Sequence, residues 1–169
     1  MIEFMKREAR GNRYMKIHII GGSGSGKTYL AENLSKKYGI RHYDLDDLQW
    51  DNDADTYGVK RSKEERGELL EEILKEPEWI IEGVYYKWVS EAFAAADVIY
   101  VLNVPLYVTK FRIIKRFCKR KLGLERGKKE TLKSLLGLLR WTEQYQKEDM
   151  VQIRKMLEPY REKCIYEEK

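Results

Sequence analysis

The sequence lacks the features that would place this protein in a membrane, a disulfide-bonded fold or a repeat architecture. Its apolar runs fall short of the roughly 20 residues that a membrane-spanning helix needs, and no signal peptide is visible at the start. The 169 residues include only two cysteines, Cys118 and Cys164, too few for a disulfide framework or a zinc site. No internal repeat or low-complexity segment is present. We therefore expect a cytoplasmic protein with reduced thiols and no membrane partner.

The charge balance leaves two classes of anionic ligand open. The chain carries 33 Lys and Arg against 28 Asp and Glu, a net charge of +5, and its pI is about 9.0. Such a surplus suits a nucleotide or a nucleic acid, and charge alone does not separate the two. A chain of this length can bury roughly 70% of its unfolded surface, enough for one sheet covered on both faces.

Residues 21–28 read GGSGSGKT and fit the phosphate-binding pattern G-x-x-x-x-G-K-[ST]. Glycines let the backbone turn so that several N–H groups point at one anion. Lys27 adds a mobile positive charge for the β- and γ-phosphates, and the Thr28 hydroxyl can ligate Mg²⁺. We expect a nucleoside triphosphate to be held by the whole loop: Gly21, Gly22, Ser23, Gly24, Ser25, Gly26, Lys27 and Thr28.

The segments on either side of this loop support the motif. Residues 15–20 form a short apolar run, which predicts a strand. Leu30, Leu34 and Tyr38 recur at four-residue spacing, and Gly39 stands where a helix would stop. A flexible Gly/Ser linker would lack both the Lys-Thr ending and these flanking elements. The pattern therefore predicts a nucleotide-binding loop between a strand and a helix.

Acidic residues follow two further predicted strands. Residues 40–44 suggest a second strand that runs into Asp44, Asp46 and Asp47, and residues 79–83 form a buried strand that includes Glu82. In open α/β sheets the carboxyl ends of the strands bind the ligand. One of the three aspartates can cap a helix, but three exceed what a cap needs, so we assign Asp46 to an acceptor. Glu82 is either a structural acid or a support for Mg²⁺ through water.

The second half of the chain predicts mainly helices. Ser62 to Glu65 form a capping box for a helix that ends at Pro77, residues 98–102 form the most apolar strand, and Pro105 can start a helix over residues 106–121. That helix is strongly basic and reads equally as a solvated face or as a lid that closes on phosphates. Residues 130–162 are mostly helical, as one helix or two, before a possible strand at 161–166.

Several motifs in this order resemble those of the adenylate kinase-like P-loop proteins, most closely the branch called topology modulation proteins. They are the P-loop, L-D-x-L-x-W at residues 45–50, W-I-I-acid-G-x-Y at residues 79–85, and the basic helix. The resemblance implies a three-layer α/β P-loop NTPase fold, with a five-stranded parallel sheet, helices on both faces and a small helical lid. We expect an extension at residues 1–14 and one domain at residues 15–169, with residues 106–129 as the lid.

The resemblance also implies roles for residues. ATP would bind residues 21–28, Mg²⁺ would lie near Thr28 and Glu82, and Asp46 would face the acceptor. The lid candidates are Arg112, Arg116 and Arg120. Glu82 stands where the family usually has aspartate, and its longer side chain moves the carboxylate.

Two functions remain after these assignments. The first is transfer of the ATP γ-phosphoryl group to a small acceptor, because phosphoryl transfer explains both the acidic cluster and a lid. The second is a nucleotide-dependent regulator or DNA-binding protein that affects DNA topology, with the basic residues 112–129 on DNA phosphates. No N-K-x-D motif for guanine recognition is present, which argues against a GTPase.

Overall fold

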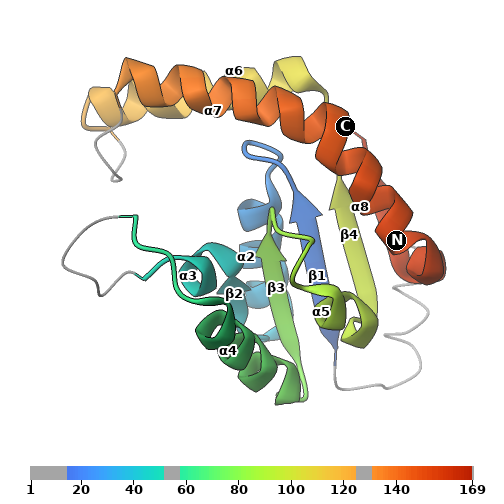
Figure 1. The fold of residues 1–169 in the computed structure, drawn as a ribbon. Helices are drawn as coiled ribbons and strands as arrows, with labels where there is room; N and C mark the ends of the chain where they lie inside the picture. Colours follow the sequence, from blue (N-terminus) through green and yellow to red (C-terminus); the bar gives the residue numbers. More distant parts are fainter. Residues whose placement is uncertain (1–14, 52–57, 125–130, 169) are drawn as a thin grey trace.

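The computed structural model describes residues 15–51, 58–124 and 131–168. Five strands and the helices between them make up this part of the chain (Figure 1). In chain order the elements are β1 (Lys16–Gly21), α2 (Lys27–Tyr38), β2 (His42–Asp44), α3 (Leu45–Gln49), α4 (Lys63–Lys75), β3 (Trp79–Gly83), α5 (Ser90–Ala95), β4 (Val98–Leu102), α6 (Leu106–Lys121), α7 (Leu132–Gln144), the π-helical η1 (Tyr145–Asp149), α8 (Met150–Leu157), the 3₁₀-helical η2 (Glu158–Lys163) and β5 (Cys164–Glu167).

The five strands form a single sheet in the order β2-β3-β1-β4-β5, and all of its pairings are parallel. The predicted five-stranded parallel sheet is therefore confirmed. Its register aligns Ile19 of β1 with Glu82 of β3, and Glu82 with Asp44 of β2. The two acids thus lie on neighbouring strands, close to the end of β1 from which the glycine loop leaves.

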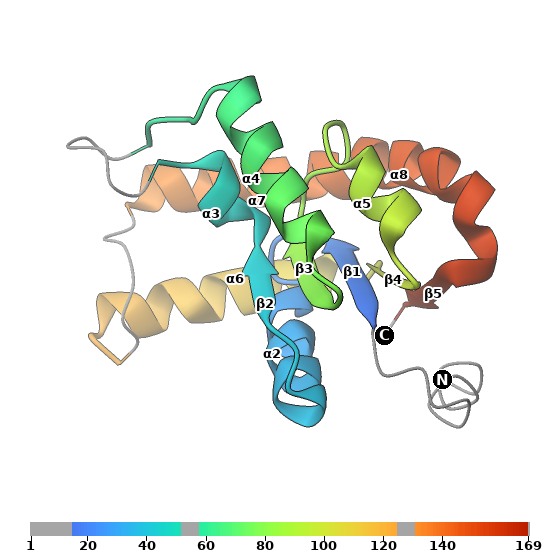
Figure 2. The same ribbon diagram turned by 90° about the horizontal axis from the view of Figure 1, so that it is seen from below.

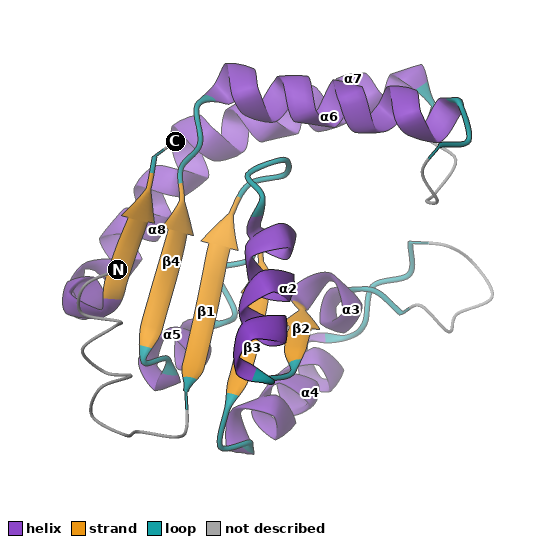
Figure 3. Ribbon diagram, turned by 180° about the vertical axis from the view of Figure 1, so that it is seen from behind, coloured by secondary structure: helices purple, strands orange, loops and turns teal. Residues whose placement is uncertain are grey.

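Helices cover both faces of the sheet (Figures 2 and 3). On one face Ile17 and Ile19 pack with Ala31 and Leu34 of α2. On the other face, side chains of α4, α5 and α8 pack against the strands. Because successive side chains of a strand point to opposite faces, the nearly continuous apolar run of β1 serves both cores. This arrangement confirms the three-layer fold.

Local signals in the sequence account for several element boundaries. Gly39 ends α2 with φ 73°, a left-handed conformation that glycine adopts without strain. Ser62 and Glu65 form both reciprocal hydrogen bonds of the predicted capping box. Strands β3 and β4 begin and end as predicted, whereas Pro105 is the N-cap of α6 rather than its first helical residue.

Helices α6 and α7 lie beside each other across the carboxyl edge of the sheet (Figure 1). Helix α7 continues through η1 into α8 with helical backbone at the junctions. The segment predicted as one helix or two is thus a continuous helical path interrupted by one π-helical turn. The expected extension, residues 1–14, lies outside the described residues, and so do residues 125–129 of the expected lid tip at residues 122–129.

Two expectations from composition can be compared with the described residues. Both cysteines are free. No helix in the described segments is long and apolar enough to cross a bilayer. His18 is fully buried against Phe93, and burial lowers its pKa to about 3, so this histidine is a neutral core residue.

Candidate active site

The phosphate loop connects the end of β1 to the start of α2, and its backbone needs glycine at two positions. Gly24 and Gly26 have φ values of 76° and 98°, in the left-handed region that other residues rarely adopt. A Cβ on Gly24 would also lie 2.8 Å from the carbonyl oxygen of Thr109 in α6. The loop is thus shaped by its own glycines and by the close approach of α6.

The start of α2 is chemically suited to an anion. Gly26 is the N-cap and makes no side-chain capping bond, and the first turn of α2 contains no acidic residue. The first backbone N–H groups of a helix have no partner within the helix, and the helix dipole adds positive potential there. A phosphate group fits these donors, as it does at many helix N-termini.

Glu82 is a buried acid at the centre of a small polar cluster beside this loop. Its side chain is fully buried, and Thr28 Oγ1 donates a hydrogen bond of 2.6 Å to Glu82 Oε1. The Nζ atom of Lys27 lies 3.6 Å from Glu82 Oε2, which accepts no hydrogen bond from any described residue. The structure therefore brings together Lys27, Thr28 and Glu82, which the sequence placed in one site.

The same cluster offers suitable ligands for Mg²⁺. Thr28 and Glu82 present oxygen atoms, which this ion prefers. Within the described segments no three His, Cys, Asp or Glu side chains converge on one point. Mg²⁺ usually keeps several waters and is held by one or two protein oxygens together with substrate phosphates. Thr28 and Glu82 fit that pattern, and their assignment to the metal stays a prediction.

Two neighbours of Glu82 were not assigned to the site from the sequence. Asp44 caps α3 by accepting a 2.9 Å hydrogen bond from the Asp46 amide, and burial together with the nearby Glu82 charge raises the pKa of Asp44 to about 6. The Nε2 atom of His42 lies 3.8 Å from Glu82 Oε1, and burial lowers the His42 pKa. Strand register was the missing information, because it alone aligns Asp44 with Glu82.

Asp46 is exposed at the start of α3 and is oriented by one tyrosine. The hydroxyl of Tyr85 donates a 2.7 Å hydrogen bond to Asp46 Oδ1. Burial and this carboxylate raise the pKa of Tyr85, so the tyrosine remains a hydrogen-bond donor at neutral pH. Tyr85 follows β3, whereas Asp46 follows β2, so this bond joins two strand ends of the same sheet edge.

Tyr85 is also one of the residues that line a pocket of about 290 Å³. Its walls are mainly aromatic, with basic and amide groups between the rings. It is lined by Gln49, Arg66, Val84, Tyr85, Tyr86, Lys87, Trp88, Trp141, Tyr145 and Asp149. The Arg66 guanidinium stacks 4.9 Å from the Trp88 ring centre and donates a 2.7 Å hydrogen bond to Gln49 Oε1. Only the aromatic residues after β3 could have indicated this pocket, because α4, α7 and η1 join it from distant parts of the chain.

The basic helix α6 contributes one of its three predicted arginines directly to the phosphate loop. Arg112 Nη1 donates to the carbonyl oxygens of Gly24 and Ser25, at 3.2 and 3.1 Å. Arg116 and Arg120 lie about 6 and 12 Å further along the helix axis, since an α-helix rises about 1.5 Å per residue. The structure thus brings Arg112 to the loop, and all three lid assignments stay predictions.

The sheet order, the glycine loop and the lysine-threonine pair at the start of α2 define an adenylate kinase-like P-loop NTPase. A family model described as an AAA domain matches residues 17–133. That match covers more than half of the chain, so the chain belongs to this family. The more specific resemblance to topology modulation proteins stays a prediction.

Two sequence relatives share parts of this chain. The "Uncharacterized protein YqaC" of Bacillus subtilis is 36% identical over 90 residues, which are 53% of this chain and 49% of that protein. Human "Adenylate kinase isoenzyme 5" is 32% identical over 80 residues, 47% of this chain and 13% of the relative. The chain thus spans about half of the first relative and a small part of the second.

Solved kinase structures have the same fold. A sugar kinase from Janibacter sp. superposes with a TM-score of 0.54 at 19% identity, covering 92% of this chain and 85% of that one. Shikimate kinase from Acinetobacter baumannii gives 0.51 at 17% identity, covering 90% and 82%. At these identities the likeness shows the fold alone.

Proposed function

We propose that this protein is an ATP-dependent phosphotransferase that transfers the γ-phosphoryl group of Mg·ATP to a small acceptor. One observation carries the proposal: Lys27, Thr28 and the buried Glu82 meet at the phosphate loop, and the pocket that Tyr85 lines lies at the same edge of the sheet. A triphosphate site beside a separate pocket is the minimum that transfer between two substrates needs.

Each group of the site has a distinct task in this proposal. Bound Mg·ATP supplies the phosphoryl group and the charge of the metal ion. Lys27 and the N-terminus of α2 stabilise negative charge on the phosphates, while Arg112 holds the loop through its carbonyl groups. Asp46, oriented by Tyr85, positions the acceptor and takes its proton when the acceptor is an alcohol.

The relatives leave both hydroxyl and phosphate acceptors open. A sugar kinase and a shikimate kinase have this fold, and an adenylate kinase isoenzyme is a sequence relative. We propose a small-molecule substrate in the pocket, Mg²⁺ at Thr28 and Glu82, and action in the cytoplasm without a membrane partner.

The proposal is tested by measuring ADP formation from Mg·ATP, and GDP formation from Mg·GTP, across nucleosides, nucleotides and small polyols. Lys27→Ala serves as the matched control for contaminating kinases. We expect at least one acceptor to raise ADP formation well above the rate of hydrolysis in the wild-type protein only. Equal rates for the two proteins with every acceptor would contradict the proposal.

DNA binding is the second candidate, and the end of α6 favours it. The last turn of that helix carries Lys119, Arg120 and Lys121. Contacts of such residues with DNA phosphates release counterions, so affinity would fall steeply with salt. Gel-shift titrations of duplex DNA at several salt concentrations measure this salt dependence directly. An affinity that does not change with salt concentration would exclude the phosphate contacts.

A further inference from the structure

The π-helical turn η1 brings one tyrosine into contact with both halves of the candidate site. A π-helical turn inside an α-helix is rare and is frequently found at functional sites. Here it separates α7 from α8 while the backbone stays helical on both sides. The first residue of the turn is Tyr145, whose side chain is only 3% exposed.

On one side Tyr145 packs against the phosphate loop. A Cβ built on Gly22 would lie 3.1 Å from Tyr145 Cδ1, which is closer than most such contacts. Gly22 is not one of the described glycines with a positive φ value, so its backbone conformation alone does not require glycine. The ring of Tyr145 is therefore a reason that this position of the loop carries no side chain.

On its other side Tyr145 reaches the segment after β3. Its hydroxyl donates a 3.0 Å hydrogen bond to the carbonyl oxygen of Val84, the residue before Tyr85. Its ring lies 5.1 Å from that of Trp141, and both rings line the 290 Å³ pocket. One side chain thus touches the phosphate loop, the pocket and the segment that orients Asp46.

The rest of the turn fixes Tyr145 in this position. Gln146 Nε2 donates a 2.9 Å hydrogen bond to the carbonyl oxygen of Val104, just after β4. Asp149 accepts a 2.6 Å hydrogen bond from the hydroxyl of Tyr86. Both ends of η1 are held by loops at the carboxyl edge of the sheet. A displacement of the Tyr145 ring therefore has to shift the residues that it contacts, Gly22 and Val84.

We propose that Tyr145 is a positioning residue that couples the phosphate loop to the acceptor pocket. When a triphosphate occupies the loop, contact through Gly22 holds the Tyr145 ring, and the ring holds Val84 and the pocket wall that follows it. The proposal rests on the proposed function, because it assigns the triphosphate to the loop and the acceptor to the pocket. It adds that the first substrate prepares the binding site of the second.

Hydrogen exchange on the full chain tests this coupling without a known acceptor. Amide exchange is compared with and without Mg·ATP in peptides that cover residues 20–30 and residues 83–90. In the wild-type protein we expect Mg·ATP to slow exchange in both peptides. In Tyr145→Phe, which keeps the ring and loses the hydroxyl, residues 20–30 should still be protected, while protection of residues 83–90 should fall by about tenfold.

Tyr43→Phe is the matched control. It also removes one tyrosine hydroxyl from a hydrogen bond, the 2.6 Å bond to Glu76, but Tyr43 lies on β2 and lines neither the loop nor the pocket. Its peptides should respond to Mg·ATP as the wild-type peptides do. Full protection of residues 83–90 in Tyr145→Phe, or none in the wild-type protein whose loop is protected, would overturn the coupling.

A second variant separates this proposal from the proposed function. In Gly22→Ala the new methyl group must displace the Tyr145 ring by a few tenths of an ångström. Without any nucleotide, exchange in residues 83–90 should then rise several-fold above the wild-type rate. An unchanged rate would refute the coupling even if ATP binds. Failure of Mg·ATP to protect residues 20–30 of the wild-type protein would instead refute nucleotide binding, and Gly22→Ala would still decide the coupling.

Discussion

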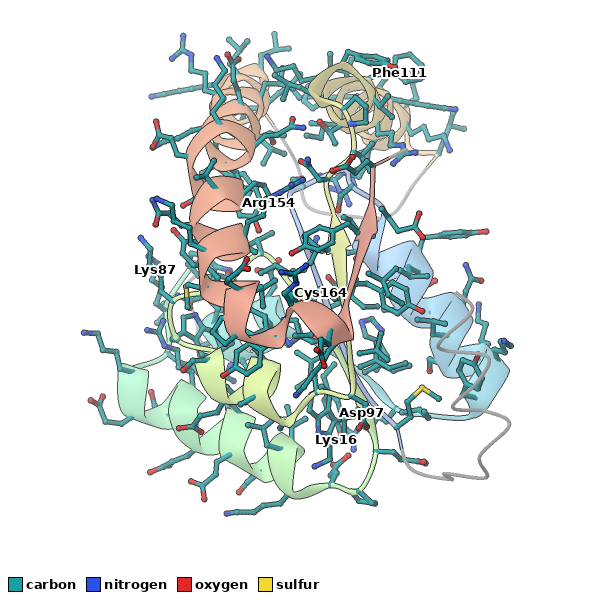
Figure 4. All side chains as sticks on the ribbon, turned by 90° about the vertical axis from the view of Figure 1, so that its right-hand side faces the viewer. Lys16, Lys87, Asp97, Phe111, Arg154 and Cys164 are labelled. Carbon is teal, nitrogen blue, oxygen red and sulfur yellow. The ribbon has the colours of Figure 1, made fainter. Side chains whose placement is uncertain are left out.

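On one side of the candidate site the phosphate loop leaves β1, whose residues Ile17, Ile19 and Ile20 are fully buried. On the other side α6 exposes Tyr107, Phe111 and Ile114, and Phe111 stands at the outer edge of the helix (Figure 4). The loop is therefore attached to the sheet core, whereas α6 has an apolar stripe that no described part of the chain covers.

The phosphate loop also rests on a larger apolar core than α6 does. Helices α6 and α7 share a cluster of Ile113, Phe117 and Leu135, with two partly buried leucines beside it. The two clusters on the faces of the sheet are much larger. Segments with few buried apolar contacts open at lower free energy than the core. The sheet side, which carries the phosphate loop, can thus hold its site residues in fixed positions, and we call it the fixed side. The α6–α7 side is suited to movement over it.

The largest expected effect is on the fixed side. Lys27→Ala should lower any phosphoryl transfer or hydrolysis by roughly two to three orders of magnitude, because it removes one preorganised positive charge. The variant should remain folded, since Glu82 keeps its hydrogen bond from Thr28, but its Tm should fall because the buried Glu82 loses the ion pair. Steady-state kinetics and thermal unfolding measure the two effects, and wild-type turnover in a folded variant would contradict the assignment.

Asp46→Asn should have the next largest effect and should be selective. Asparagine keeps the size of the side chain and can still accept the Tyr85 hydrogen bond, but it has no negative charge and cannot act as a base. We expect near-normal Mg·ATP affinity by calorimetry and a fall of roughly a hundredfold in transfer to the acceptor. Loss of ATP binding would place Asp46 in the metal site or the fold instead of the acceptor site.

The sequence predicted the local motifs of the site in more detail than the contacts between distant segments. The motif at residues 21–28 depends on local backbone chemistry, and the strands before it and at Glu82 are short apolar runs, so both could be predicted without knowing which strands pair. The partnership of Asp44 with Glu82 depends on register between strands far apart in sequence. Likewise, the contact of Tyr145 with Gly22 joins residues separated by most of the chain.

Alanine substitutions along α6 distinguish loop support from a lid or a DNA surface. Arg112→Ala should reduce turnover by about tenfold through the loss of hydrogen bonds to the phosphate loop, with unchanged DNA affinity. The double variant Arg116→Ala/Arg120→Ala should impair turnover if these residues close over phosphates. If they bind DNA instead, it should weaken duplex binding and flatten the salt dependence. ATPase and gel-shift assays on both variants separate the cases, and two unchanged results would indicate a solvated face.

The smallest expected effect is on the free energy of unfolding, and it depends on how far Asp44, on the fixed side, is shielded from water. The pKa of Asp44 is about 6 in the folded protein, above its ordinary value of 3.8, because burial and Glu82 disfavour the charged form. Between these two values the folded state binds more protons than the unfolded state, so the free energy of unfolding decreases as pH rises and stays lower above pH 6.

Asp44→Asn should remove this contribution, since asparagine does not titrate and can still cap α3. We expect the variant to be more stable than the wild-type protein at pH 7 by about 1 kcal/mol, a value reduced for the partial exposure of Asp44. The advantage should shrink toward zero near pH 4, where the wild-type carboxyl is largely neutral when folded. Urea unfolding from pH 4 to pH 8 measures the difference. A constant difference across this range would mean that Asp44 ionises at its ordinary pKa, and that this edge of the sheet is better hydrated than the burial of Glu82 implies.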